Sequence, residues 1–300
     1  MSNLIHYTAC PICRAGETRI VLNAKDHTVS GKLFPIAECL QCSLRFTQDV
    51  PDSNSIGRYY KAEDYISHTN TSKGLINRLY QLVRKRTLAS KRRLIQRSTK
   101  LQKGALLDYG SGAGSFVDEM SKAGWNVLGL EPDVEARRKA KELYGVELGE
   151  TGSFFQIEAN RFDAISLWHV LEHVHELNEC VAQLKRVLKD DGRIFIAVPN
   201  HTSFEANAYK EHWAAYDVPR HLYHFSPASM KKLMSNHGLE IEKQRPMWYD
   251  SFYISLLSSR YKNGTSNWFG AGLNGLISNL SALFDVERCS SVIYVVRKKS

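Results

Sequence analysis

Long apolar runs are missing from this chain of 300 residues. No stretch of about 18 consecutive apolar residues occurs, so the sequence predicts no membrane-spanning helix. The first residues lack the basic segment and apolar run of a secretory signal, and we therefore expect a cytoplasmic protein. With 43% hydrophobic and 24% charged residues, the composition is that of an ordinary globular protein.

Acidic residues are absent from residues 73–103, which hold eleven Lys and Arg. The whole chain carries a formal charge of +9, so the other residues sum to −2. Leucines at helical spacing among these cations predict a basic amphipathic helix or helix pair. Three roles stay open: a solvated connector, a face attracted to an anionic membrane surface, or a face for an anionic substrate or RNA. Tyr80 is the one aromatic residue in this segment, which does not favour a base-stacking platform.

Four of the six cysteines form two C-x2-C pairs with 25 residues between them. The expected metal ligands are Cys10, Cys13, Cys39 and Cys42. Four thiolates complete a tetrahedral, structural zinc site with no open position. A segment of about 50 residues has little core without such a site. Disulfides are the alternative, which a cytoplasmic location does not favour. We therefore expect a zinc ribbon over 1–50.

A glycine-rich turn follows the apolar pair Leu106-Leu107, in the order Asp108-Tyr-Gly110-Ser-Gly112-Ala-Gly114. The pattern predicts a buried strand, a tight turn and the start of a helix. Glycine lets the backbone approach a ligand closely, and helix N-terminal amides attract a negative group. Glu131 lies 21 positions after Gly110, at the spacing where a second strand offers a carboxylate to ribose hydroxyls. The sequence thus predicts an adenosine-containing cofactor.

The acid at the start of this turn separates two cofactor classes. A nicotinamide fingerprint is G-x-G-x-x-G/A, and Ser115 stands at the position of its third glycine or alanine. A pyrophosphate would be repelled by Asp108, whereas the ammonium of S-adenosylmethionine (SAM) would donate hydrogen bonds to it. The residues therefore favour SAM.

The D-x-G-x-G-x-G turn followed by Leu130-Glu131-Pro132-Asp133 resembles the class I SAM-dependent methyltransferases. Downstream, 162–174 is similar to the family's fourth-strand motif and 188–200 to its fifth-strand hairpin entry. The resemblance covers about 104–241, with a last strand near 292–296. It implies that the first motif holds the methionine end of SAM and that Glu131 holds the ribose hydroxyls. The expected cofactor-binding residues are Asp108, Gly110, Ser111, Gly112, Gly114, Glu131, Pro132 and Trp168.

Strand and helix patterns alternate after residue 104, which predicts a parallel sheet covered on both faces. We expect strands near 104–109, 126–130, 146–148, 162–168, 192–198, 239–245 and 290–297, and helices near 114–123, 133–143, 177–188 and 227–236. The fold class is α/β: a Rossmann-like, doubly wound, mostly parallel seven-stranded sheet with a small N-terminal zinc ribbon. The expected domains are the ribbon (1–50), a basic helical connector (51–103) and the methyltransferase domain (104–300), in which 246–285 is an insertion or substrate lid.

Three polar residues after the fourth expected strand are candidates for catalysis. His169, Glu172 and His173 would share one face of a helix. An imidazole suits deprotonation of a hydroxyl or an acidic C–H, so His173 is the leading general base. Alternatively, Glu172 and His173 only cap and orient the loop. Related quinone O-methyltransferases bind a divalent cation with a similar triplet that begins with Glu; here His169 takes that place, which argues against magnesium.

A second candidate cluster runs from Tyr216 to Pro227 and resembles the H-x-x-Y-F-S region of sugar C-methyltransferases. His221 matches a histidine that contributes to catalysis there, and Tyr216 is a further catalytic candidate. Arg220 stands where those enzymes place an acid, which weakens the case for C-methylation. Its planar guanidinium would suit a carboxylate or phosphate. The alternative is a helix-entry loop with incidental histidines.

The combined features predict a cytoplasmic SAM-dependent methyltransferase with a structural zinc. We expect a small-molecule acceptor: a sugar nucleotide, a glycan or lipid precursor, or a quinol-like ring, with O-methylation slightly favoured. An anionic or lipid-linked acceptor, with peripheral membrane contact, would suit the basic connector and 246–285. One alternative is an RNA methyltransferase, but the N-P-P-Y-type motif of base N-methylating enzymes is missing, and nucleic acid is not favoured. Another is a SAM-binding partner protein without catalysis.

Overall fold

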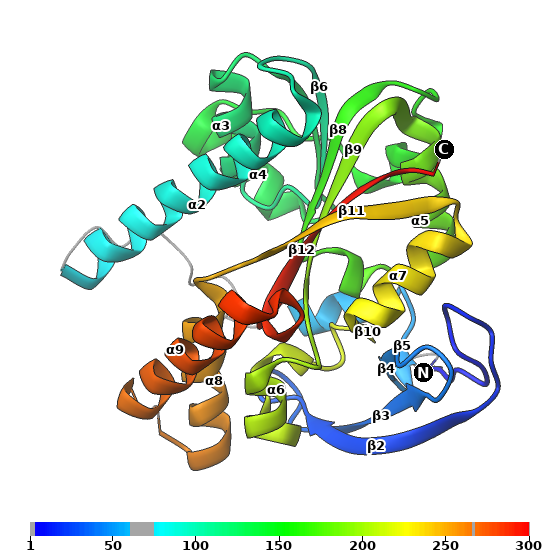
Figure 1. The fold of residues 1–300 in the computed structure, drawn as a ribbon, viewed down its shortest axis with the longest axis vertical. Helices are drawn as coiled ribbons and strands as arrows, with labels where there is room; N and C mark the ends of the chain where they lie inside the picture. The colour runs from blue at the N-terminus through cyan, green and yellow to red at the C-terminus, as the bar shows by residue number, and fades with distance from the viewer. Residues whose placement is uncertain (1–3, 61–74, 266–267, 300) are drawn as a thin grey trace.

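The computed structural model describes residues 4–60, 75–265 and 268–299 and contains a central sheet of six strands (Figure 1). The order across this sheet is β11-β12-β9-β8-β6-β7. The strands are β6 (Ala105–Tyr109), β7 (Asn126–Leu130), β8 (Phe162–Trp168), β9 (Leu188–Pro199), β11 (Leu239–Pro246) and β12 (Ser291–Lys298). Strands β6 to β9 run parallel, whereas β12 is antiparallel to both β9 and β11. The expected α/β class is confirmed.

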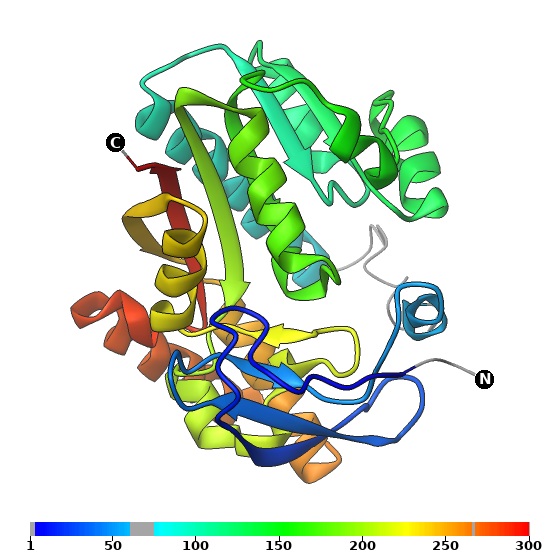
Figure 2. The same cartoon turned by 90° about the vertical axis from the view of Figure 1, so that its right-hand side faces the viewer.

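Helices cover both faces of the sheet, because successive strand residues point to opposite sides and both sides are apolar. On one face, Ile95 packs with Phe116, Leu106 and Phe195; on the other, Leu107 shares a core with Leu184. The covering helices are α2 (Leu75–Thr99), α3 (Ser115–Lys122), α4 (Val134–Tyr144), α5 (Leu177–Val187) and α7 (Pro227–Asn236). Figure 2 shows the layers from the side.

Local sequence signals mark where several of these helices begin. Asp133 caps α4, its side chain accepting a hydrogen bond from the backbone N–H of Ala136 at 2.7 Å. Ser226 and Ser229 form a reciprocal capping box at the start of α7, where Pro227 occupies the first turn. Helix α2 confirms that the basic segment is helical within its described part.

The N-terminal ribbon is joined to the main domain by a shared sheet of order β10-β4-β3-β2. Its strands are β2 (Thr18–Lys25), β3 (Leu33–Cys39), β4 (Arg45–Thr47) and β10 (Tyr223–His224), beside a small pair of β1 (Leu4–Ile5) with β5 (Val50–Pro51). Strand β10 lies just after His221, and Tyr223 pairs with Phe46 of the ribbon. The ribbon therefore holds one side of the second candidate cluster in place.

The sheet has six strands where the sequence pattern predicts seven. The expected strand at 146–148 is replaced by one isolated bridge between Leu130 and Gly149. Two hydrogen bonds hold it, from Gly149 N to Gly129 O and from Glu131 N to Gly149 O, both 2.9 Å. The segment Val146-Glu147-Leu148 between two glycines, at a half-exposed edge, is too short to extend this pairing.

The segment 246–285, between β11 and β12, forms two packed helices, α8 (Asp250–Asn263) and α9 (Trp268–Phe284). Shorter helical turns are η1 (Ile56–Tyr60), η2 (Thr151–Gln156), η3 (Leu171–His173), α6 (Phe204–Tyr209), η4 (Lys210–His212), η5 (Ala214–Tyr216) and η6 (Val286–Arg288). Among the described helices, none is both long and apolar enough to cross a membrane.

Candidate active site

The glycine turn lies where β6 and β8 adjoin, the point at which the strand order reverses and ligands bind in such sheets. Gly110 and Gly114 have φ of 78° and 77°, the left-handed conformation that glycine adopts at no steric cost. A Cβ at Gly110 would lie 2.4 Å from Cγ2 of Val170. Beside Gly112 no heavy atom lies within 4 Å of the corresponding Cβ position, so the turn keeps open space along its middle.

Asp108 is buried at the end of β6 and is held by the neighbouring strand. Ser166 Oγ donates a hydrogen bond of 2.6 Å to its Oδ1. Burial raises the pKa of Asp108 to about 6, against the opposing effects of Ser166 and the nearby Lys91. Near neutral pH the carboxylate is therefore negative in a site of low polarity, where it can pair with an ammonium group.

Glu131 follows β7 and turns its carboxylate back towards the glycine turn. Its Oε2 accepts a hydrogen bond from Gly112 N at 2.7 Å, and its Oε1 accepts one from Asp133 N at 3.0 Å. Each oxygen retains a second lone pair that a ribose hydroxyl can use. The structure thus brings Glu131 to the turn as expected, whereas Pro132, beside it, is exposed.

Lys91 of α2 reaches the same end of the sheet, which the sequence reasoning missed. Its ammonium lies 4.2 Å from the centre of the Trp168 ring. Burial lowers the pKa of Lys91 to about 8, while the charges of Asp250 and Asp108 oppose this shift. No sequence pattern distinguishes Lys91 from the other ten cations of this segment. Only the packing of α2 against the sheet brings its side chain to the site.

His169 follows β8 and stands between two carboxylates. Its backbone has φ of 57°, and its Nε2 lies 2.9 Å from Asp250 Oδ2 of α8, while its Nδ1 lies 3.4 Å from Glu172 Oε1. Burial would lower the pKa of His169, but the charge of Asp250 and its hydrogen bond raise it to about 10. His169 is therefore an imidazolium at neutral pH and links the insertion to the site.

His173 and His221 lie side by side although they are far apart in the sequence, with ring centroids 4.6 Å apart. Nδ1 of His173 lies 3.0 Å from Arg220 O, and Nδ1 of His221 lies 2.8 Å from Ala215 O. A carbonyl oxygen only accepts, so each Nδ1 carries the hydrogen and each Nε2 keeps a lone pair in the neutral ring. Burial and the neighbouring His221 lower the pKa of His173 to about 4.

Glu172 completes this cluster. It is fully buried, and neither carboxylate oxygen has a hydrogen-bond partner within the described part of the chain. One ligand atom from each of Glu172, His173 and His221 lies within 4.8 Å of the others, so the three side chains could hold a cation. Tyr60, whose hydroxyl lies 3.0 Å from His173 Nδ1, borders the cluster from η1.

Tyr216 and Arg220 are turned towards other partners. The Tyr216 hydroxyl accepts a hydrogen bond of 2.9 Å from Arg45 of the ribbon. Arg220 is buried and donates to Asp217 at 2.9 Å and to Tyr59 O at 2.9 Å. This pairing leaves its guanidinium unsuited to a substrate anion, contrary to the use suggested by its sequence position.

The four ribbon cysteines converge, with one sulfur from each within 4.8 Å of the others. Cys10 Sγ lies 3.5 Å from Cys42 Sγ, and Cys13 Sγ lies 3.5 Å from Cys39 Sγ. These separations exceed a disulfide bond of about 2.05 Å. They are close to the ~3.8 Å edges of a tetrahedron with zinc–sulfur bonds of about 2.3 Å. The four side chains therefore fit a tetrahedral metal.

The cofactor turn, the switch point of the sheet and the acid after β7 define the class of SAM-dependent methyltransferases. A family model described as a methyltransferase domain matches residues 77–244, more than half of the chain. The chain belongs to this methyltransferase domain family. The roles of the individual site residues stay predictions.

Two curated relatives share part of this domain. The ubiquinone biosynthesis O-methyltransferase of Xanthomonas oryzae pv. oryzae is 25% identical over 166 residues, covering 48% of this chain and 66% of that protein. The protein of the same name from Actinobacillus pleuropneumoniae serotype 7 is 33% identical over 108 residues, covering 32% of this chain and 46% of its own. This chain thus spans just under two thirds of the first relative.

One solved structure is similar over nearly the whole chain. The 1,6-didemethyltoxoflavin-N1-methyltransferase of Burkholderia thailandensis, with bound 1,6-didemethyltoxoflavin and S-adenosylhomocysteine, has a TM-score of 0.51. The match covers 92% of this chain and 100% of that one at 13% sequence identity. At this identity the likeness shows the fold alone.

Proposed function

We propose that this protein transfers a methyl group from SAM to a hydroxyl group of a small molecule. The observation that carries the proposal is the pair of adjacent imidazoles, the half-buried His173 and the buried His221. Backbone carbonyls hold both in the tautomer that leaves Nε2 able to accept a proton. His173 lies in the segment after β8 and His221 in the segment after β9, at the same end of the sheet as the glycine turn.

The residues at the turn fit the polar groups of SAM. Asp108 would accept from the ammonium, Glu131 from the ribose hydroxyls, and Lys91 would pair with the carboxylate. Gly112, beside which the described residues leave open space, gives room for the chain of the ligand. When bound, SAM supplies an electrophilic methyl group and a neutral leaving group. The protein then has to align the acceptor and remove its proton.

His173 is the proposed general base. Its low pKa keeps it neutral at physiological pH, and the negative charge of Glu172 favours the imidazolium that forms when a proton is accepted. The hydrogen bond from Nδ1 to Arg220 O holds the ring during this transfer. His221, whose ring centroid lies 4.6 Å from that of His173, is the second base candidate.

O-methylation is supported by the relatives named as ubiquinone biosynthesis O-methyltransferases, and by Arg220, which stands where sugar C-methyltransferases place an acid. Candidate acceptors are a quinol-like ring, a sugar nucleotide, or a glycan or lipid precursor. We further propose that the four ribbon cysteines hold a structural zinc. The reduced thiolates of such a site suit the cytoplasmic location expected from the sequence.

The test measures SAM affinity by calorimetry and S-adenosylhomocysteine release with a panel of quinols and sugar nucleotides. His173→Ala and His221→Ala should each keep SAM affinity within about twofold and lower turnover by roughly 100-fold to 10,000-fold. His237→Ala, a histidine at the end of α7 that bonds to Asn178, serves as the control. Unchanged turnover in both site variants would sink the assignment.

A further inference from the structure

Helix α9 of the insertion has its polar side towards the protein. Asn274 Nδ2 donates to the Tyr209 hydroxyl at 2.9 Å, and Ser278 Oγ donates to Glu205 Oε2 at 2.8 Å. Asn279 Nδ2 donates to Trp248 O, also at 2.9 Å. These bonds fix the rotation of the helix, so the opposite side must face outwards.

The outward side of α9 is apolar. Its residues are spaced by three, four and three positions, which forms one stripe on a helix. Four leucines on this stripe are 49–66% exposed, and Phe284 at its end is 93% exposed. The leucines are Leu273, Leu276, Leu280 and Leu283. A surface helix of a globular protein carries polar residues at such positions, so this stripe indicates an apolar partner.

Exposed aromatic residues extend the patch at the start of α8. Trp248, Tyr249, Phe252 and Tyr253 are 38–48% exposed. Phe252 packs beside α9, since its ring atoms lie against Gly275. Tryptophan and tyrosine are the residues that favour the boundary between lipid and water, because each has an apolar ring and a polar tip.

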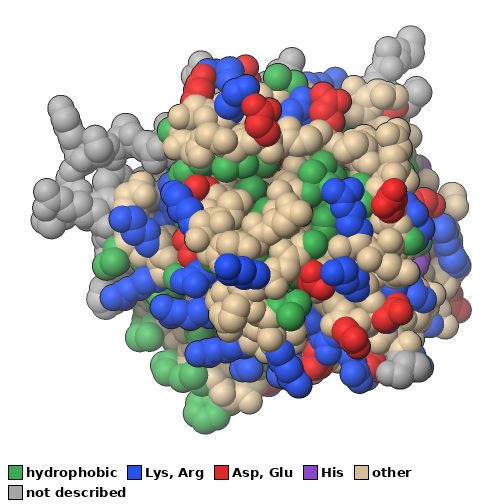
Figure 3. Space-filling view, turned by 90° about the horizontal axis from the view of Figure 1, so that it is seen from above, with side chains coloured by type: hydrophobic (Ala, Val, Ile, Leu, Met, Phe, Trp, Pro, Cys, Tyr) green, Lys and Arg blue, Asp and Glu red, His purple; other side chains and the backbone are tan. Residues whose placement is uncertain are grey.

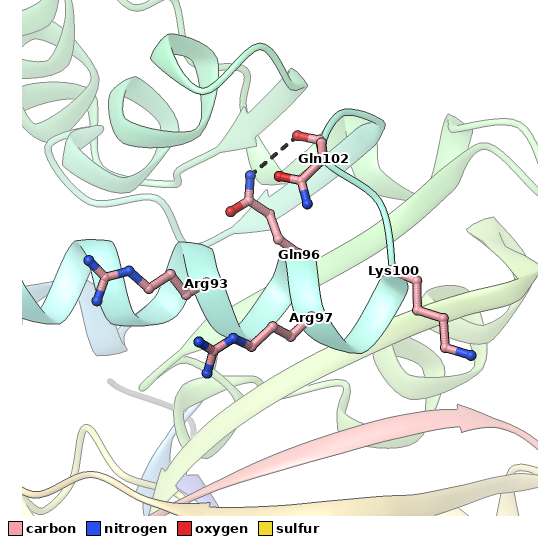
Figure 4. A pocket seen from close by; sticks show the side chains of 5 residues that line it. All are labelled: Arg93, Gln96, Arg97, Lys100 and Gln102. Carbon is pink, nitrogen blue, oxygen red and sulfur yellow. Dashed lines mark hydrogen bonds between the residues drawn. The ribbon is translucent and has the colours of Figure 1, made fainter.

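Charge distinguishes a lipid surface from a second copy of the chain. Residues 264–284 contain no charged residue, while the whole chain carries +9. Arg93 and Arg97 of α2 lie around a hollow on one side of the helix, together with Lys100, which directly follows the helix (Figure 4). In the view from above, hydrophobic side chains gather at the lower left beside a run of Lys and Arg (Figure 3). Two copies of the chain, each with a net positive charge, would repel each other at this surface. Anionic lipid headgroups would instead complement the cations of α2.

We propose that the outward stripe of α9, with the aromatic residues of 248–253, docks on an anionic lipid bilayer and that the cations of α2 contact its headgroups. The helix would lie in the plane of the interface, as amphipathic helices do, without crossing the bilayer. Vesicle binding requires no methyl transfer, so its test does not depend on the proposed function.

The experiment is flotation of the full chain with vesicles of phosphatidylcholine alone or with 40% phosphatidylglycerol, at low salt on the order of 50 mM. The wild type should float with anionic vesicles and remain unbound with neutral ones. The double variant Leu276→Gln and Leu280→Gln should reduce the partition coefficient at least tenfold. The matched control is Leu143→Gln on α4, since Leu143 is 51% exposed, and it should bind within twofold of wild type.

Retained SAM affinity of the double variant checks that the main domain remains folded. An Arg93→Gln and Arg97→Gln variant should weaken binding to anionic vesicles and flatten its salt dependence. Wild-type protein that stays unbound to anionic vesicles at low salt would overturn the proposal. A second result would also overturn the proposal. The wild type would bind no vesicles, and light scattering would show a wild-type dimer that the leucine variant converts to a monomer, because the stripe would then join two copies.

Discussion

The carboxyl group of Glu205 lies in the interior between α6 and α9 and should make stability depend on pH. It is fully buried, its Oε2 accepts a hydrogen bond from Ser278, and its Oε1 has no partner among the described residues. Burial raises the pKa of Glu205 from 4.5 to about 7, because the interior disfavours the charged carboxylate. We expect Glu205→Gln to remove this cost at alkaline pH.

The direction of the pKa shift determines how the free energy of unfolding changes with pH. A carboxyl group whose pKa is higher in the folded state binds its proton more tightly there. Its stabilising contribution to the free energy of unfolding is therefore complete below about pH 4.5. The contribution is lost as pH rises through about 7. A shift of roughly 2.5 units corresponds to about 3 kcal/mol between these limits. The glutamine variant should therefore gain about 3 kcal/mol over wild type between pH 4.5 and pH 8.5.

The assay is urea unfolding of both proteins at several pH values, with the difference in unfolding free energy plotted against pH. Taking the difference cancels other groups that titrate in this range, such as Asp108 with its pKa of about 6. Glu158→Gln, at an exposed position, is the control and should give a flat difference. A flat difference for Glu205→Gln as well would refute the reasoning, because the carboxyl would then not be desolvated.

Two further predictions concern ligand binding. Lys91→Met should raise the Kd for SAM about tenfold, because the ammonium over Trp168 would no longer pair with the SAM carboxylate; Lys85→Met, at an exposed position of α2, should leave the Kd unchanged in calorimetry. Cys13→Ser should lower the zinc content measured by atomic emission and reduce the melting temperature by several degrees, since a structural metal site stabilises its small domain. A normal zinc content in Cys13→Ser would contradict the four-thiolate site.

Patterns that depend on neighbouring residues were readable without the fold. The spacing of Asp108, the glycines and Glu131 predicted both the turn and the acid after the next strand, because backbone sterics and strand length determine this geometry locally. The two C-x2-C pairs likewise predicted that four thiolates converge. The prediction of a strand at 146–148 was wrong, since the structure shows one bridge there, and no secondary structure was predicted for 246–285, which forms two helices.

Helix α9 reverses the usual amphipathic arrangement of a surface helix. Four of its leucines point outwards and its hydrogen-bonded polar residues point inwards, which only the tertiary structure reveals. Lys91 presents a similar difficulty, because it is one of eleven cations and only the packing of α2 brings it to Trp168. The pairing of His173 with His221 joins two loops 48 positions apart, which no local pattern contains.

The sequence by itself determined the α/β class, the SAM-type turn and the cysteine cluster, because each follows from backbone geometry or ligand spacing over short distances. Only the tertiary structure decided which charged side chains are free of internal pairing and can act on a ligand. It buried Arg220 against Asp217, held His169 between Asp250 and Glu172, and buried the Glu172 carboxylate beside His173 and His221. The physical reason is that desolvation and pairing, which set the charge and tautomer of each group, depend on residues distant in the chain.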